Sequence, residues 1–259
     1  MFKNKQKGAG IALLVPFRAD GPTRKEDWLW LAQYWMNALP AAKLIVCDEG
    51  GFPFSKSGSV NKAARQCGLC DIFVILDADC YIDSDVILDC AQAIRKARKE
   101  GRKLWFVPYR HFFRLTKNAT HNVIMSDPKN PLRFSTPPPR NDIEGVEGSA
   151  FGHWYGALIQ IMPREAFIAA GGMDERFRGW GGEDVSFMHA VDTLYAKHKT
   201  TNNDVLHLWH EKLGVVWNER RWEGQEVAGN NNSLSWKYSD RLGDRLRMQQ
   251  LVDEGRNNG

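Results

Sequence analysis

Short, mainly apolar segments that each end in polar or charged residues recur through the first 110 residues of the chain. They lie at residues 11–15, 43–47, 72–76 and 104–107, and stretches with helical periodicity separate them. Continuous apolar runs of this length are typical of parallel strands that are covered on both faces. Strands that alternate with helices predict a doubly wound sheet. We therefore predict an α/β fold with a mostly parallel sheet flanked by helices.

The segments between these strands carry helix signals. Thr23 and Glu26 match a capping box, and an apolar stripe that starts at Trp28 continues along one helix face. A second helix is predicted at about residues 60–66. A third helix is predicted to begin after Asp83, which is suited to the N-cap position.

The second half of the chain alternates less regularly. Residues 117–147 contain several prolines and no clear periodicity, so we predict a long loop there. Residues 154–161 predict a further strand, and Pro163 is suited to begin a short helix that Gly171 and Gly172 end.

Length and composition are consistent with one domain. A chain of 259 residues with 43% hydrophobic side chains can bury a full core, and we expect a domain at residues 1–218 with a helical tail, 219–259, packed on it. The net charge of +4 permits an anionic ligand without requiring a polyanion. No apolar run approaches the roughly 20 residues that cross a bilayer, and we expect a cytoplasmic protein. The sequence leaves the oligomeric state open.

Four charged residues follow the predicted strands. In an open α/β sheet ligands bind beyond the carboxyl ends of the strands, so Arg18, Asp48, Asp77 and Asp79 are expected to gather at one edge. Two aspartates one residue apart can both face Mg²⁺ or Mn²⁺ that bridges to a diphosphate. The alternative for this pair is a turn that caps the next helix.

Two histidines far downstream offer further ligands. His207 and His210 are separated by three residues, a spacing that suits a shared cation. The alternative for either residue alone is a histidine that is hydrogen-bonded within the core.

The run from Gly179 to Asp184 is the most specific string in the chain. Its glycines allow a close approach of the backbone, Trp180 offers a flat face for a sugar ring, and Glu183 and Asp184 open a helix. The alternative is a glycine-rich turn with an acidic helix start and a core tryptophan.

Taken in order along the chain, these motifs resemble the GT-A glycosyltransferases, a Rossmann-like fold. The resemblance is strongest to the β-1,4-galactosyltransferases and to the galactosyltransferase-like domains of chondroitin-type polymerases. The matching runs are Val15 to Arg18, Phe54 to Asn61, Asp77 to Asp79, Gly179 to Asp184, and the histidines around His210. They extend over residues 11–212, which is most of the chain.

The resemblance implies a role for each matching position. With Asp48 from the same sheet edge, the implied donor-nucleotide residues are Pro16, Phe17, Arg18, Lys56, Asn61, Asp77 and Asp79. The implied metal ligands are Asp79 and His210, and His207 falls where galactosyltransferases have a methionine ligand. The implied cofactor is Mn²⁺ or Mg²⁺.

The same resemblance assigns the glycine-rich run. Asp184 resembles the catalytic base, and Trp180 and Glu183, beside Gly181 and Gly182, resemble acceptor-site residues. Gly156 resembles a glycine next to the donor sugar. Val185 replaces a third acidic residue of the galactosyltransferases, so the acceptor need not be N-acetylglucosamine.

The activity that we expect is a metal-dependent, inverting transfer of a sugar from a nucleotide diphosphate donor, with a uridine donor implied by the resemblance. Asp184 would accept the proton of the acceptor hydroxyl. Three alternatives remain open: a retaining transferase of the N-acetylgalactosaminyltransferase type, a sugar-phosphate nucleotidyltransferase and a non-catalytic sugar-binding module.

The acceptor is not defined by the sequence. Residues 109–114 interleave aromatic and basic side chains, a pattern that can stack on bases and hold phosphates. The alternative is an ordinary segment at a strand edge. A glycan, a protein and a modified DNA base therefore all stay possible acceptors.

Overall fold

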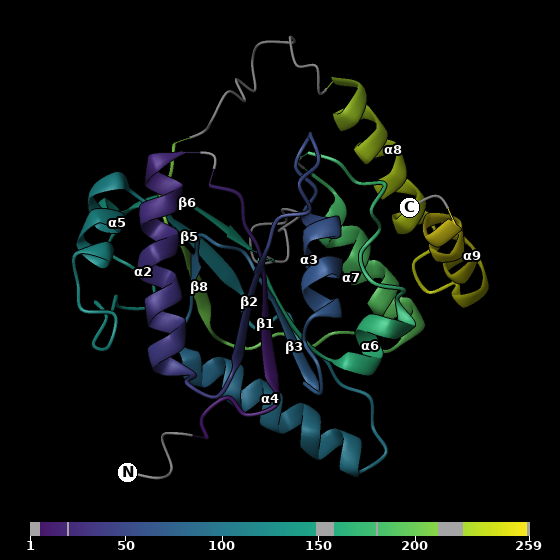
Figure 1. The fold of residues 1–259 in the computed structure, drawn as a ribbon, viewed down its shortest axis with the longest axis horizontal. Coiled ribbons are helices and arrows are strands. Elements are labelled where there is room, and N and C mark those ends of the chain that lie inside the picture. Colours follow the sequence, from purple (N-terminus) through teal and green to yellow (C-terminus); the bar gives the residue numbers. More distant parts are fainter. Residues whose placement is uncertain (1–5, 20, 149–157, 180, 212–224, 258–259) are drawn as a thin grey trace.

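The computed structural model describes residues 6–19, 21–148, 158–179, 181–211 and 225–257. Within them, helices surround two four-stranded sheets (Figure 1). The first sheet contains β1 (Ile11–Pro16), β2 (Lys43–Cys47), β3 (Ile72–Leu76) and β7 (Ile159–Pro163) in the order β2-β1-β3-β7. Strand β1 is parallel to both β2 and β3, whereas β7 is antiparallel to β3. The prediction of an α/β fold is confirmed.

The second sheet holds the downstream histidine region against the end of β3. It contains β4 (Cys80–Tyr81), β5 (His111–Leu115), β6 (Ile143–Gly148) and β8 (Asp204–His207) in the order β4-β8-β5-β6. Cys80 of β4 pairs with His207 of β8 in an antiparallel register. Because β4 follows β3 after three residues, this pairing brings His207 next to Asp79.

The helices cover the sheets from several sides. The elements are α2 (Pro22–Ala38), α3 (Lys56–Arg65), α4 (Ser84–Lys99), α5 (Lys117–Ile124), a 3₁₀ helix (Arg140–Asp142), α6 (Arg164–Ala169), α7 (Glu183–Leu194), α8 (Gln225–Asp240) and α9 (Arg245–Asn257). Helix α3 packs on β1 and β2, and α4 and α6 contact β7. Helices α8 and α9 lie outside α6 and α7 (Figure 1). Within the described residues, every helix is too short or too polar to span a bilayer.

An aromatic cluster fixes α2 against the second sheet. The ring centroids of Tyr34 and Tyr81 are 4.9 Å apart, and those of Trp30 and Tyr81 are 5.5 Å apart. The Tyr34 hydroxyl donates to the Ile82 carbonyl at 3.0 Å and accepts from the Ser84 amide at 2.9 Å. Buried polar groups need such partners, and these bonds set where α2 sits beside the end of β3.

Several predicted boundaries are confirmed. Strands β1, β2 and β3 coincide with the predicted segments, and Asp83 caps α4 by accepting from the Asp85 amide at 3.0 Å. Pro163 precedes α6, and Gly171 and Gly172 follow it with φ values of 81° and 78°. These positive values are readily accessible to glycine, so this turn is formed as predicted.

Two helix starts were predicted wrongly. Helix α2 begins at Pro22 after Gly21 and has no side-chain cap, so the capping box of Thr23 and Glu26 does not form. Pro22 sets the first turn instead, where its missing N–H has no cost. Helix α3 begins four residues earlier than predicted, because the Ser55 hydroxyl caps it by accepting from the Gly58 amide at 3.0 Å.

The middle of the chain holds further corrections. Residues 104–107 are not a strand but contribute a single bridge position, Phe106, which pairs with Ile161 and Lys199. The predicted loop at 117–147 contains α5, the 3₁₀ helix and most of β6. Helix α5 forms there because the Thr116 hydroxyl caps it, accepting from the Ala119 amide at 3.2 Å. The strand predicted at 154–161 is described only from Ile159 onward, as β7.

The aromatic and basic segment at 109–114 is not at a strand edge. It forms most of β5, which lies between β8 and β6 inside the second sheet. Tyr109, Phe112 and Phe113 are buried, so their rings are not exposed for stacking on bases. The basis in this segment for a nucleic acid acceptor is therefore removed.

Candidate active site

The carboxyl ends of β1 and β2 form the first part of the site. Pro16 pairs with Cys47 at the last position of the register, and the Phe17 amide donates to the Cys47 carbonyl at 3.0 Å. Beyond them, Arg18 forms two hydrogen bonds to Asp48, each 2.6 Å long. The guanidinium of Arg18 also lies 5.1 Å from the centroid of the Phe54 ring. The hydrogen bonds from Arg18 lower the pKa of Asp48, so this pair is charged at neutral pH.

Asp79 and the two histidines come together at the junction of the two sheets. The Asp79 Oδ2 atom is 3.3 Å from His210 Nε2, and Oδ1 is 3.8 Å from His207 Nε2. The three candidate ligand atoms lie within 4.8 Å of one another. The Leu208 amide donates to the Asp79 carbonyl at 2.8 Å, which fixes the histidine segment beside the aspartate.

The donor set fits a divalent cation. One carboxylate and two imidazoles are ligands that Mn²⁺ accepts. The His210 Nδ1 atom is 3.1 Å from the Glu211 carbonyl, so this nitrogen donates and Nε2 is left for a cation. Burial opposes ionisation of Asp79, but His207, His210 and Arg24 outweigh it and hold its pKa well below the usual range. Burial lowers the pKa of His207, which keeps this ring neutral as a ligand must be.

A buried lysine joins two of the predicted carboxylates. Lys56 begins α3, Asp77 follows β3, and Asp184 is the second residue of α7. The Lys56 Nζ atom lies 2.8 Å and 2.9 Å from the two oxygens of Asp184 and also forms an ion pair with Asp77. This triad connects Asp184 to the strand end that carries Asp79.

Burial dominates the electrostatics of this triad. It raises the pKa of Asp77 to about 6, although Lys56 opposes the shift. It also raises the pKa of Asp184 well above its usual range, again against the effect of Lys56. Burial alone would lower the pKa of Lys56, but Asp184 and Asp77 outweigh it and raise this pKa. Lys56 therefore stays an ammonium between two carboxyl groups.

The glycine-rich run shapes the start of α7. Gly182 is its N-cap with φ of 88°, and the buried Glu183 accepts from the Gly181 amide at 3.1 Å. A Cβ atom at Gly182 would lie 3.0 Å from Ser235 Cβ on α8, so the turn packs closely against the C-terminal region. Trp180 and Gly156 lie outside the described residues.

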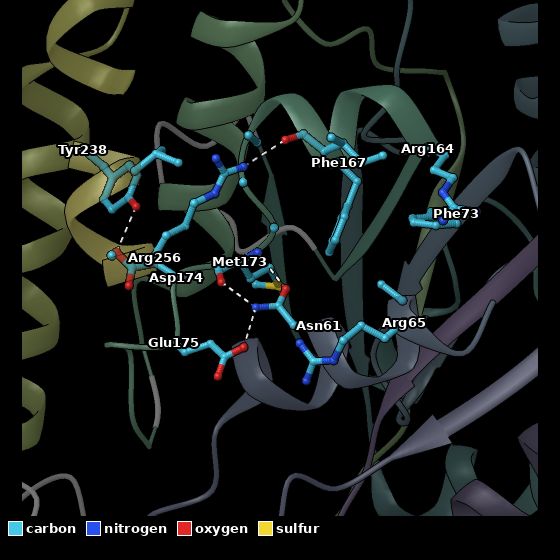
Figure 2. Close-up of a pocket in the computed structure, with 17 residues that line it drawn as sticks. Asn61, Arg65, Phe73, Arg164, Phe167, Met173, Asp174, Glu175, Tyr238 and Arg256 are labelled. Atoms are coloured by element: carbon cyan, nitrogen blue, oxygen red, sulfur yellow. Dashed lines mark hydrogen bonds between the residues drawn. The ribbon is translucent and has the colours of Figure 1, made fainter. Parts of the chain in front are cut away.

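Asn61 is the predicted site residue that the structure places elsewhere. Its Nδ2 atom donates to the Met173 carbonyl and to Glu175 Oε1, both at 2.8 Å, and its Oδ1 accepts from the Met173 amide at 2.9 Å. It lines a cavity of about 590 Å³ between α3, α6 and the C-terminal helices. Figure 2 shows Asn61 there together with Glu175 and Tyr238. Asn61 thus links α3 to the turn after α6, and the structure does not bring it to Asp77 and Asp79.

Two residues of α2 near the cation site were missed by sequence reasoning. Arg24 Nη2 is 3.4 Å from Asp79 Oδ2, and Asp27 has His210 and Asp79 among its charged neighbours. Burial raises the pKa of Asp27 to about 7, while His210 opposes the shift. A signal existed, since Asp27 precedes the apolar Leu31 by four residues and so lies on the buried stripe of the helix.

The arrangement of helices around the two sheets is that of the GT-A fold. The structure is similar to the crystal structure of GalNAc-T7 with UDP, GalNAc and Mn²⁺, with a TM-score of 0.51 and 12% identity. The similarity covers 95% of this chain and 54% of that chain. At this identity it supports the fold alone.

Sequence comparisons connect the chain to particular families. Residues 151–200, which contain the glycine-rich run, match the N-terminal domain of galactosyltransferase. Human chondroitin sulfate N-acetylgalactosaminyltransferase 2 is 26% identical over 168 residues, which are 61% of this chain and 27% of the human protein. Mouse chondroitin sulfate synthase 3 is 21% identical over 199 residues, 76% of this chain and 20% of the mouse protein. The chain thus spans about a quarter or less of the length of these relatives. It is similar in sequence to glycosyltransferases of galactosyl- and N-acetylgalactosaminyltransferase type.

Proposed function

We propose that this domain transfers galactose or N-acetylgalactosamine from a UDP-sugar to a hydroxyl of a glycan acceptor, with inversion and with Mn²⁺ or Mg²⁺. The observation that carries the proposal is the continuous set of side chains from His210 and His207 through Asp79 and Asp77 to Lys56 and Asp184. The relatives are named as a chondroitin sulfate N-acetylgalactosaminyltransferase and a chondroitin sulfate synthase. These names support N-acetylgalactosamine as a transferred sugar and a glycan as the acceptor.

Each end of this set has a separate task. Asp184, held at the start of α7, accepts the proton of the attacking hydroxyl, which a carboxylate with a raised pKa does more readily than an ordinary one. Asp79, His207 and His210 would hold the cation, which stabilises negative charge on a departing diphosphate when it is bound. The Arg18–Asp48 pair with Phe54 provides a charged, aromatic surface at the strand ends for the nucleoside.

The first test is release of UDP from a panel of UDP-sugars in the presence of Mn²⁺, followed by NMR of the anomeric configuration of the product. Inverted configuration and loss of turnover on chelation are expected. A product that retains the donor configuration would contradict the direct displacement, and release of pyrophosphate would indicate a nucleotidyltransferase instead.

The second test removes the base. We expect Asp184→Asn to lower kcat by about 100-fold or more, because a general base commonly contributes about 10²- to 10⁴-fold. UDP binding measured by calorimetry is expected to stay nearly unchanged. The control is Asp253→Asn on α9, whose side chain is 52% exposed and which should leave kcat as it is. Full activity of the Asp184 variant would exclude this residue as the base.

A further inference from the structure

Helix α2 presents one face to the cation site. The Thr23 hydroxyl accepts from the Glu211 amide at 3.3 Å, next to His210, and Arg24 reaches Asp79 at 3.4 Å. Residues three and four apart lie on the same face of a helix. Asp27 follows Thr23 by four residues and Arg24 by three, so it lies one turn further along the face that these two contacts direct toward Asp79 and His210.

Asp27 is a buried acidic residue with one carboxyl oxygen that makes no hydrogen bond to the described residues. The residue is 2% exposed, and its Oδ2 atom has no hydrogen-bond partner among the described residues. A buried carboxyl oxygen without a partner is costly and usually has a specific cause. Its strongest charged neighbour is His210, followed by Asp79. The free oxygen therefore belongs to the surroundings of the candidate cation ligands.

The charge of the cation site indicates what this carboxylate does. Arg24 carries a positive charge 3.4 Å from Asp79, so these two side chains together are neutral. A divalent cation needs negative charge from its ligands and their neighbours, and Asp27 is the next carboxylate on the helix face that carries Arg24.

We propose that Asp27 is a second carboxylate of the Asp79–His207–His210 cation site and raises its affinity for Mn²⁺ or Mg²⁺. The proposal rests on the metal dependence in the proposed function. Asp27 is outside the group of three whose ligand atoms lie within 4.8 Å of one another. It would therefore act as a positioning residue that contributes negative charge beside the cation, rather than as one of the three ligands.

The test measures binding of Mn²⁺ to the metal-free protein, with and without UDP, by calorimetry and by loss of the free Mn²⁺ signal in electron paramagnetic resonance. The Asp27→Asn variant keeps the shape of the side chain and removes its charge. Groups around metal ligands typically change affinity by about 10- to 100-fold, so we expect the Kd for Mn²⁺ to rise by about tenfold or more. The matched control is Glu26→Gln, which removes the same charge from an exposed neighbour and should change Kd less than about twofold.

Each outcome separates the proposal from the proposed function. A Kd of Asp27→Asn within twofold of wild type would overturn the role of Asp27. If Asp79→Asn abolishes Mn²⁺ binding in the same series, the assignment of the cation site to Asp79 and the histidines would still stand. Wild-type protein that binds no Mn²⁺ with or without UDP would overturn both.

A second measurement distinguishes a role of Asp27 in cation binding from a purely structural role in the fold. The melting temperature of Asp27→Asn is expected to equal or exceed that of wild type in chelator and to rise less on addition of Mn²⁺. Equal Mn²⁺-induced shifts in the two proteins would contradict the proposal. If Asp27→Asn does not fold, Asp27→Ser is measured. Failure of both variants to fold without metal would also overturn the proposal, because a charge that serves the cation is not needed by the metal-free fold.

Discussion

The buried ammonium group of Lys56 forms ion pairs with two carboxyl groups, those of Asp77 and Asp184, at the centre of the site. Lys56 lies within 2.9 Å of both oxygens of Asp184 and pairs with Asp77 as well. An adjacent positive charge favours the ionised form of a carboxyl group, whereas burial disfavours it. The pKa of Asp184 is raised because burial outweighs Lys56. Lys56 thus limits how far this pKa rises.

Replacement of Lys56 is expected to move the pH dependence of turnover. A general base works only when ionised, so activity is lost as the pH falls through the pKa of Asp184. Without the Lys56 charge this pKa rises further, and the acid limb of kcat moves to higher pH, by about one unit or more. The measurement compares kcat against pH at saturating donor for wild type, Lys56→Met and Lys56→Arg.

Lys56→Arg keeps the charge and should leave the limb near its wild-type position. Lys62→Met is the control on the same helix, since Lys62 is exposed and, among the described residues, donates to the Asp48 carbonyl at 2.9 Å. An acid limb that stays in place in Lys56→Met would show that Asp184 is not the titrating base.

Most of the candidate site residues that the sequence predicts lie at the end of a strand or at the start of a helix. Arg18, Asp48, Asp77 and Asp79 could be proposed together because parallel strands end at one edge of the sheet. Arg24 and Asp27 were missed because they lie inside a helix whose rotation and packing depend on the aromatic cluster around Tyr34. The position of Asp27 on the apolar stripe indicates burial, but its placement beside Asp79 and His210 depends on tertiary packing that local patterns do not contain.

At the scale of elements, the difference between local pattern and tertiary contact explains which strands were predicted. Strands β1 and β3 are fully buried, so their apolar runs were unambiguous. Strand β4 has two residues and β8 has four, too few for a period-2 pattern to be recognised. Strand β8 forms by pairing with β5, and β4 forms by pairing with β8 across more than 120 residues of sequence.

Helix α3 gives a prediction that separates stability from donor binding. Asn61 makes three hydrogen bonds to the turn after α6, and its removal leaves the Met173 backbone groups without these partners. We expect Asn61→Ala to lower the free energy of unfolding by about 1–3 kcal/mol, with the KM for the donor nearly unchanged. Urea denaturation and donor kinetics measure the two quantities.

Asn37→Ala is the matched control, because Asn37 is exposed on α2 and its side chain donates, within the described part of the chain, to the Gln33 carbonyl. We expect it to change stability by less than about 0.5 kcal/mol. A large rise in the donor KM of Asn61→Ala without loss of stability would instead support the nucleotide role that the family resemblance implies.

At the scale of the whole molecule, the C-terminal helices are attached to the helix that carries Asp184. Arg245 of α9 donates to the Leu194 carbonyl at the end of α7 at 2.6 Å. Tyr238 of α8 donates to Asp174 at 2.9 Å, and Arg176 donates to the Leu251 carbonyl at 3.0 Å. Because α7 contacts both α8 and α9, we propose that the tail folds as one unit with the rest of the domain.

Substitutions of two leucines in α9 test whether the C-terminal helices unfold together with the rest of the domain. Leu251 is 1% exposed and Leu246 is 71% exposed, so the same substitution probes a packed and an unpacked position on one helix. We expect Leu251→Ala to lower the free energy of unfolding by about 2–5 kcal/mol and Leu246→Ala to change it by less than about 0.5 kcal/mol. Tryptophan fluorescence and far-UV circular dichroism in urea should report one coincident transition for both variants. Two separate transitions, or a main transition that Leu251→Ala leaves in place, would mean that α9 is a separate unit and does not support the position of Asp184.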